Sequence, residues 1–344
     1  MEQERIAAEK LRPEAYGYYA TGSGDEISLA EAGAAWQRIR FRPRVLRDVS
    51  TVDTGVTLFD SDLATPILAA PTAYHAGAHP DGECATVRGV GDAGSLMVLS
   101  SRCSRRIEDV AAAATGPWWF QVYVLNDPDA TAGMVRRAVA AGAGALVLTV
   151  DTPYPGNKKR SNAEPPATEE EFLVNLAEHL APGADPYVAV SQSAACTVDT
   201  LRELTGYGVP VLVKGVLRGD DAADCVVAGA AGVIVSNHGG RQLDQAIATA
   251  DALGEVVAAV GGRVPVLVDG GVRTGRDVLA ALALGASAVL LGRPILWALA
   301  ADGAAGVTAA LTAVREELVE ALALAGVAAA SAVTADLVAP RTLG

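Results

Sequence analysis

The chain contains little cysteine, few aromatic residues and few lysines. Its four cysteines, Cys84, Cys103, Cys196 and Cys225, lie far apart, with no Cys-x-x-Cys pair and no spacing typical of a zinc site. This pattern argues against a disulfide framework and against a metal site, so we expect reduced, packed thiols. Aromatic residues make up only 5% of the 344 residues, although 51% are hydrophobic. A core built from Ala, Val and Leu favours layers of helices and parallel strands over an aromatic-rich β-sandwich.

Long apolar runs and an excess of positive charge are also absent. No stretch approaches the length of uninterrupted apolar residues that a membrane span requires, and the charged segment from Met1 to Lys10 lacks a signal-peptide core. The formal net charge of -13 argues against general binding to the phosphate backbone of nucleic acids. We therefore expect a cytoplasmic protein whose partners are neither nucleic acids nor membranes.

Eight short apolar runs have the length and composition of buried parallel strands. Most of them are followed by Ala-rich segments with helical periodicity, such as Asp127 to Ala141, Asp220 to Ala228, Gln245 to Val260 and Gly275 to Leu284. The eight runs are Pro66–Ala70, Leu96–Leu99, Trp118–Val122, Ala145–Val150, Pro210–Val213, Gly232–Val235, Pro265–Val268 and Ala288–Leu291.

This alternation predicts an α/β protein with a single (β/α)8 barrel, the TIM barrel, over residues 1–344. An open, doubly wound sheet is the main rival, but it would more often carry a Gly-x-Gly-x-x-Gly turn after its first strand, and none follows Ala70. We expect residues 1–60 to form an N-terminal helical extension and residues 154–196 to form a long variable loop after the fourth strand.

Polar residues follow all eight expected strands. In a barrel of this type the chemistry collects at the C-terminal strand ends, so these residues are expected to share one site. In strand order they are Pro71, Thr72 and Ala73; Ser100; Gln121 and Tyr123; Thr149 and Asp151; Lys214; Ser236 to Arg241; Asp269 to Arg273; and Gly292 with Arg293.

The segment after the sixth strand is the most informative one. His238 and Arg241 lie three residues apart and would place a proton acceptor beside a fixed cation. That pair suits a substrate with a carboxylate and a removable proton. Gly239 and Gly240 remove side chains where a flat molecule could approach the backbone.

The last two strand ends predict a phosphate site. Gly270, Gly271 and Gly292 would expose backbone N–H groups near helix starts, and Arg273 and Arg293 would add fixed cations. A cofactor with a phosphate tail would then lie across the barrel mouth. Lys214, one of only four lysines, could place a positive charge beside an electron-accepting ring.

These residues carry a resemblance to the FMN-dependent 2-hydroxy acid oxidases and dehydrogenases, from about Tyr16 to about Gly326. Within that family the chain is most similar to mandelate and 4-hydroxymandelate oxidases, by Ala73-Tyr74-His75 and its Ala-rich, acidic composition. The matching segments are Tyr18-Tyr19 with Gly22, Phe41–Arg44, Ala70–Ala73, His79-Pro80 with Gly82-Glu83, Gln121–Tyr123, Leu148–Pro153, Val213–Val216, Ser236–Asp244, Asp269–Arg273 and Leu291–Pro294.

The resemblance implies FMN as the cofactor and gives each residue a role. His238 would take the substrate proton, and Asp151 would stabilise the imidazolium that forms. Arg241 would clamp the substrate carboxylate, with Tyr18 adding a hydrogen bond and Tyr123 lying against the substrate hydroxyl. The residues implied to hold FMN are Pro71, Thr72, Ala73, Ser100, Gln121, Thr149, Lys214, Ser236, His238, Gly239, Arg241, Asp269, Gly270, Gly271, Arg273, Gly292 and Arg293.

The segment after Pro153 departs from the family pattern. The family usually has Gly-x-Arg-x-x-Asp there, with an arginine that assists the substrate carboxylate, whereas this chain has Lys158 at the arginine position. A lysine keeps the charge but loses the fork geometry. Either Lys158 binds the substrate in its place or Arg160 reaches in from two residues further on.

The implied reaction is the oxidation of an (S)-2-hydroxy acid, of the mandelate or 4-hydroxymandelate type, to the 2-oxo acid, by hydride transfer or by a carbanion route. The altered loop leaves a larger natural-product substrate as an alternative. Ala73 favours O2 as the acceptor, giving hydrogen peroxide, with a dehydrogenase using another acceptor as the alternative. Glu164 and Glu169 to Glu171 would be repelled by an anionic membrane. The resemblance also implies a homo-oligomer, often a tetramer. The intact pair of His238 and Arg241 disfavours two other classes, a flavin-dependent isomerase and a non-catalytic flavin-binding protein.

Overall fold

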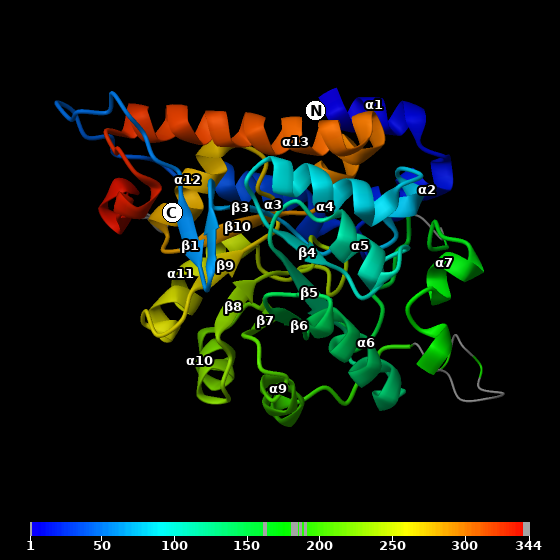
Figure 1. Ribbon diagram of the computed structural model, residues 1–344. Helices are drawn as coiled ribbons and strands as arrows, with labels where there is room; N and C mark the ends of the chain where they lie inside the picture. Colours follow the sequence, from blue (N-terminus) through cyan, green and yellow to red (C-terminus); the bar gives the residue numbers. More distant parts are fainter. Residues whose placement is uncertain (1, 161–163, 180–184, 186–187, 189–190, 340–344) are drawn as a thin grey trace.

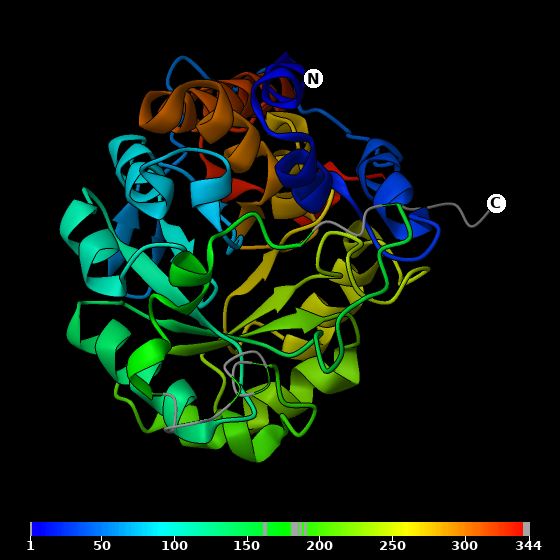
Figure 2. The same ribbon diagram turned by 90° about the vertical axis from the view of Figure 1, so that its right-hand side faces the viewer.

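The computed structural model describes residues 2–160, 164–179, 185, 188 and 191–339. Eight parallel strands close into a barrel in the order β10-β3-β4-β5-β6-β7-β8-β9, which confirms the predicted fold. Figure 2 shows these strands inside a ring of helices. The strands are β3 (Ile67–Ala69), β4 (Met97–Leu99), β5 (Trp118–Val122), β6 (Leu146–Thr149), β7 (Val211–Val216), β8 (Gly232–Val235), β9 (Val266–Val268) and β10 (Ala288–Leu291).

Strand residues alternate between the barrel interior and the surrounding helices, and both faces are buried. Branched and aromatic side chains such as Leu68, Trp119, Leu212 and Ile234 fill the interior as one cluster. Their neighbours along the strands, such as Phe120, pack outward against the helices in a second, larger cluster. Burial on both faces explains why each strand is a continuous apolar run in the sequence.

Helices follow the strands along the outside of the barrel (Figure 1). Local signals set their starts: the Asp127 side chain accepts hydrogen bonds from the first backbone N–H groups of α6, and Thr274 and Asp277 form a capping box at α12. The helices are α4 (Gly82–Asp92), α5 (Ile107–Ala113), α6 (Pro128–Ala140), α9 (Val198–Thr205), α10 (Gly219–Val227), α11 (Thr249–Val260), α12 (Gly275–Ala283) and α13 (Arg293–Ala325). Short 3-10 turns are η1 (His75–Gly77), η3 (Ala330–Ala332) and η4 (Ala335–Leu337).

The N-terminal extension is helical, as expected, and packs on the barrel. It contains α1 (Glu2–Lys10), α2 (Pro13–Ala20) and α3 (Ile27–Gln37). In Figure 1, α1 lies beside α13, and α3 contacts α11 and α12. The sequence analysis missed a hairpin, β1 (Val56–Leu58) and β2 (Ser61–Leu63), whose side chains join the interior cluster of the barrel. Phe59 at its turn packs on Trp119, with ring centroids 5.6 Å apart.

Helix α13 is long and apolar enough to cross a membrane by length and composition alone. Within the structure, 61% of its most apolar window is buried, and the helix packs against α4, α1 and α12. Its backbone leaves helical geometry at Asp302 and Gly303, which divides it into two segments. The apolar faces of α13 are therefore used in packing on its neighbours.

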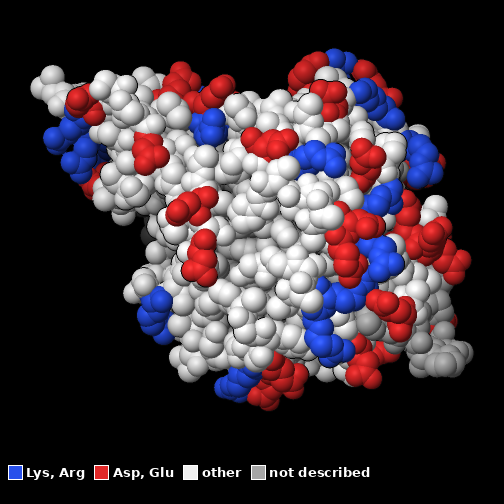
Figure 3. Space-filling view, viewed as in Figure 1, with Lys and Arg blue, Asp and Glu red and all other residues white. Residues whose placement is uncertain are grey.

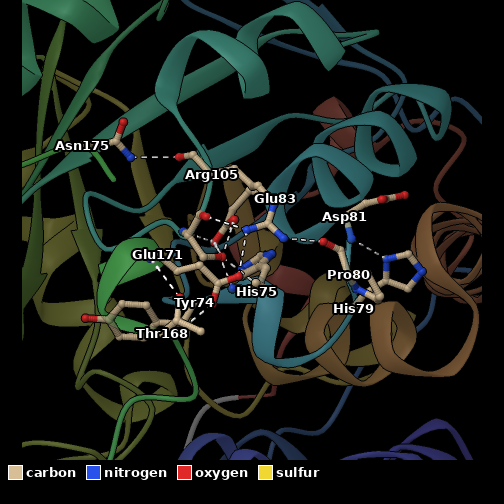
Figure 4. A network of polar contacts seen from close by, with 12 residues as sticks. Tyr74, His75, His79, Pro80, Asp81, Glu83, Arg105, Thr168, Glu171 and Asn175 are labelled. Atoms are coloured by element: carbon tan, nitrogen blue, oxygen red, sulfur yellow. Dashed lines mark hydrogen bonds and ion pairs between the residues drawn. The ribbon is translucent and has the colours of Figure 1, made fainter. Parts of the chain in front are cut away.

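The expected loop 154–196 follows β6 and lies partly outside the described residues. Its described part contains α7 (Glu169–Leu173) and the short turn η2 (Ala177–His179). Arg105 connects α7 to the rest of the molecule, because it forms an ion pair of 3.0 Å with Glu171 and also donates to the Pro80 carbonyl (Figure 4). In Figure 3, acidic and basic side chains are interspersed over the face that is shown.

Candidate active site

One pocket at the C-terminal end of the barrel receives residues from all eight strands or the loops that follow them. Four predicted residues do not line it: Asp151, Gln121 and Ser236 each form a hydrogen bond with a lining residue, and Thr149 pairs with Lys214 in the barrel register. The predicted residues that line it are Tyr18, Pro71, Thr72, Ala73, Ser100, Tyr123, Lys158, Lys214, His238, Gly239, Arg241, Asp269, Gly270, Gly271, Arg273, Gly292 and Arg293.

His238 follows β8 and has two polar partners on its ring. Nδ1 lies 2.9 Å from Oδ1 of Asp151, and the phenolic oxygen of Tyr123 lies 3.3 Å from Nε2. The backbone of His238 is left-handed, with φ of 56°, and its N–H donates to the Ser236 hydroxyl. Such strained backbone at a non-glycine residue is typical of functional sites.

Asp151 can approach His238 because the next strand has a glycine beside it. A Cβ on Gly215, whose φ is +110°, would lie 2.6 Å from Cβ of Asp151. The Asp151 side chain is only 12% exposed. Burial alone would raise its pKa, but His238 and Lys214 together lower the pKa below its usual value. Asp151 is therefore an ionised partner for the histidine.

Arg241 follows β8, and its side chain reaches the C-terminal end of helix α2. Its Nη1 donates to the carbonyls of Tyr18 and Thr21 at 2.8 and 2.7 Å, and its guanidinium lies 5.2 Å from the centre of the Tyr18 ring. Arg293 donates to the Tyr19 carbonyl in the same turn at 3.0 Å. The last carbonyls of a helix carry partial negative charge, so α2 stabilises both arginines.

Lys158 and Arg160, the two candidates for a second positive side chain that binds the substrate carboxylate, have different surroundings. Lys158 lines the pocket, whereas Arg160 forms a 2.9 Å ion pair with Glu26 and donates to the Ala20 carbonyl. Burial and, secondarily, the charge of Arg241 lower the pKa of Lys158. A lysine beside an arginine with no carboxylate between them is a typical arrangement for anion binding. The geometry thus favours Lys158.

Lys214 is buried under the pocket, at 4% exposure. Its ammonium lies 3.0 Å from Oδ2 of Asp269 and donates to the Ser236 hydroxyl at 2.7 Å. Burial would lower its pKa, but Asp269 and Asp151 outweigh that effect and raise the pKa. The lysine therefore keeps a positive charge at the centre of the barrel mouth.

A family model described as FMN-dependent dehydrogenase matches residues 7–340. The chain belongs to this family. It is 43% identical to an L-lactate oxidase of Nostoc sp., over 94% of this chain and 93% of that one. It is 45% identical to the glycolate oxidase of Spinacia oleracea, over 94% of this chain and 91% of that one.

Solved structures of mandelate oxidase have the same architecture. The structure with (S)-4-hydroxymandelic acid is 40% identical, covers 98% of this chain and 97% of that chain, and superposes with a TM-score of 0.89. The structure with (S)-2-phenylpropionate has a TM-score of 0.86. The protein is thus an oxidoreductase of the FMN-dependent 2-hydroxy acid oxidase family, with FMN as its cofactor.

Unsatisfied polar atoms around Lys214 fit a flavin. Among the described residues, Nε2 of Gln121, Oγ1 of Thr149 and Oδ1 of Asp269 are buried without a hydrogen-bond partner. Few buried polar groups remain unpaired in native proteins, so each indicates a missing partner. All three belong to residues predicted to hold FMN, and Thr149 pairs with Lys214 in the barrel register. A polar ring system at this place would satisfy them.

A cluster of arginines fits the phosphate of FMN. Arg273 and Arg293 line the same pocket as Gly271 and Gly292. Burial and the charges of Arg241 and Arg273 lower the pKa of Arg293 to about 9. Such crowding of half-buried cations is relieved when an anion binds between them. The predicted phosphate residues are therefore gathered as the sequence indicated.

A buried polar network fixes the loop that carries Thr72 and Ala73. Nε2 of His75 lies 2.6 Å from Oγ1 of Thr72, and Nδ1 lies 2.8 Å from Oγ1 of Thr86. Glu83, fully buried, accepts from the backbone N–H of His75 at 2.9 Å (Figure 4). This network positions the backbone on which the flavin ring would lie.

Among the residues that line the pocket, several were not assigned to the site from the sequence, and four of these are polar or aromatic residues with side chains suited to binding: Tyr74, Arg102, Gln192 and Gln242. Arg102 follows β4 by three residues and could have been found by extending the search beyond the first polar position after each strand. Gln192 comes from the variable loop, for which the sequence has no periodic signal. Tyr74 has left-handed backbone, with φ of 58°.

Proposed function

We propose that the protein oxidises an (S)-2-hydroxy acid of the mandelate or 4-hydroxymandelate type to the 2-oxo acid, and that O2 reoxidises its flavin with release of hydrogen peroxide. The observation that carries the proposal is His238, fixed by Asp151 and facing the pocket beside Arg241. A proton acceptor, a carboxylate site and a flavin site then share one cavity. The FMN-dependent oxidases among the relatives support the choice of acceptor.

Each residue of the pocket has a role that follows from its position. Arg241 and Lys158 bind the substrate carboxylate, and Tyr123 donates a hydrogen bond to the C2 hydroxyl. His238 accepts the proton that leaves when the C2–OH group becomes a carbonyl, and Asp151 stabilises the imidazolium. When bound, FMN supplies an acceptor for the two electrons and the second hydrogen. The lysine buried beneath the pocket keeps a fixed positive charge next to these groups.

Aromatic side chains near the carboxylate site support an aryl substrate. Phe172 of α7 stacks on Tyr74 with ring centroids 6.1 Å apart, and Tyr74 packs edge-on against Tyr18 at 6.0 Å. Tyr18 and Tyr74 both line the pocket, so the aryl group of a substrate bound there would pack against aromatic rings. The mandelate oxidase structures, one of them with (S)-4-hydroxymandelic acid, support the same choice.

An anaerobic titration tests the proposal. The holoprotein is mixed with (S)-mandelate, (S)-4-hydroxymandelate, (S)-lactate and glycolate, and the flavin absorbance is followed. We expect bleaching with the aryl acids at lower concentrations than with lactate or glycolate, and recovery with peroxide formation when O2 is admitted. Persistent oxidised flavin with all four acids would overturn the proposal, and bleaching without reoxidation by O2 would indicate a dehydrogenase.

A further inference from the structure

Arg102 is a pocket-lining cation that the carboxylate site does not use. It follows β4, and its backbone N–H donates to the Ser100 hydroxyl at 3.1 Å. Its guanidinium carbon lies 5.7 Å from the centre of the Phe172 ring, on α7. Arg102 therefore reaches the side of the pocket that α7 covers, whereas Arg241 lies at the end of α2.

A row of three rings connects the two arginines. Phe172 contacts Arg102 at one end, Tyr74 stacks on Phe172, and Tyr18 at the other end contacts Arg241 at 5.2 Å. Burial raises the pKa values of Tyr74 and Tyr18. The positive charge of Arg102 opposes this rise in both residues, so Arg102 lies close enough to act on their rings. The two guanidiniums thus face one cavity from opposite ends of an aromatic row.

The charge balance of the pocket favours a second anion. Asp269 is the one carboxylate among the described residues that line it, and it is paired with Lys214. On the substrate side, Arg102, Lys158 and Arg241 would face a single negative charge if the substrate were a monocarboxylate. This excess stands out in a chain whose formal net charge is -13. Arginine has five N–H donors, so Arg102 can bind an anion in addition to the contacts it already makes.

We propose that Arg102 is a second anion-recognition residue and that the preferred substrate is a 2-hydroxy acid whose side chain carries a second carboxylate. The inference rests on the proposed function, from which it takes the reaction, and adds that the side chain of the substrate is negatively charged. The first carboxylate binds at Arg241 and Lys158, the aryl or alkyl part lies along Tyr74, and the second carboxylate pairs with Arg102. The oxidation at C2 is unchanged.

Helix α7 holds this recognition point in place. The Arg105–Glu171 ion pair fixes the helix next to the residue that contacts Arg102, and Thr168 and Glu171 form its capping box. Figure 4 shows Glu171 between its two partners, Arg105 and Thr168. A guanidinium stacked on a ring is partly fixed before an anion arrives, which lowers the entropy cost of binding.

Binding of product analogues to the oxidised holoprotein tests the proposal without turnover. Benzoylformate is compared with its 3- and 4-carboxy derivatives, with Kd read from the change in flavin absorbance. We expect at least one carboxy derivative to bind about tenfold more tightly than benzoylformate. Arg102→Met should remove that preference, and Arg102→Lys should restore part of it. Arg106→Met is the matched control, because Arg106 is an exposed arginine of the same loop, with its side chain 58% accessible, and should keep the native ratio.

The outcomes separate the two proposals. Equal or weaker binding of both carboxy derivatives by the native protein would overturn the role of Arg102. An unchanged ratio in Arg102→Met would overturn it too, with FMN content showing that the variant is folded. If no 2-hydroxy acid bleaches the flavin but the binding preference depends on Arg102, the oxidase function fails while the anion site stands.

Discussion

Asp151 holds the imidazole of His238 by Nδ1, at 2.9 Å, and leaves Nε2 directed toward Tyr123 and the pocket. An ionised carboxylate can only accept, so Nδ1 carries a hydrogen and Nε2 is the ring nitrogen that faces the pocket. The orientation of the imidazole is therefore fixed by a residue that follows a different strand, β6.

His238→Gln should retain FMN and lose most substrate oxidation. Glutamine fills a similar volume but cannot take up a proton at neutral pH, so flavin reduction should slow about 10²- to 10⁴-fold. Anaerobic stopped-flow mixing with (S)-mandelate measures the rate, and the flavin spectrum measures retention. Reduction at the native rate would remove His238 from the role of base.

Asp151→Asn should slow flavin reduction about 10²-fold or more, with a smaller effect on substrate affinity. The amide preserves size but removes the negative charge that stabilises the imidazolium. Rapid mixing separates the limiting rate from the Kd. A rise in Kd alone, at an unchanged limiting rate, would mean that Asp151 acts only on substrate binding.

Lys158→Ala should weaken substrate binding about tenfold or more, while Arg160→Ala should leave it close to native. Only Lys158 lines the pocket, because Arg160 is paired with Glu26. The KM values of the two variants, compared with that of the native protein, show which of the two residues binds the substrate. A larger effect from Arg160→Ala would show that this arginine leaves Glu26 when substrate binds.

The kcat/KM value should fall as pH rises above neutrality, at a pH below the usual range for a lysine. Burial and Arg241 lower the pKa of Lys158, so its charge is present below that lowered pKa and is lost as pH rises through it. Lys158→Arg keeps its charge over the accessible range and should abolish this decline. Identical pH profiles for the two proteins would assign the decline to another group.

Gly271→Ala should destabilise the protein by about 1–3 kcal/mol and weaken FMN binding. Gly271 has a φ of +83°, and a methyl group there would clash with the Ala32 carbonyl of α3. Gly254→Ala is the control, since Gly254 is exposed in α11 with open space around it, and it should be neutral or stabilising by up to about 1 kcal/mol. Thermal unfolding of both apoproteins measures the difference.

The barrel was predictable because burial on both faces makes each strand a continuous apolar run. The hairpin around Phe59 was not, since its two strands are short and its residues mix polar and apolar types. Local patterns reveal an element when its own residues alternate or repeat. They do not reveal one whose burial depends on contact with a distant residue such as Trp119.

The candidate site was predictable where residues follow a strand directly, as His238 follows β8. The choice between Lys158 and Arg160 could not be made from the sequence, because it depends on Glu26, more than a hundred residues away. The place of Arg102 near the pocket could be predicted from its position three residues after β4, but its role could not. Its importance follows from the ring of Phe172 on α7, which belongs to a loop without periodic signal.

The carbonyls at the end of α2 accept hydrogen bonds from Arg241 and Arg293, one on the substrate side and one on the phosphate side. The smallest unit able to perform the reaction is therefore larger than the eight strands and their helices. Because the acceptors are backbone carbonyls, a shift in the path of the N-terminal segment would change the surroundings of both arginines without altering a single barrel residue. The N-terminal segment is thus a place where affinity for substrate and cofactor can change together.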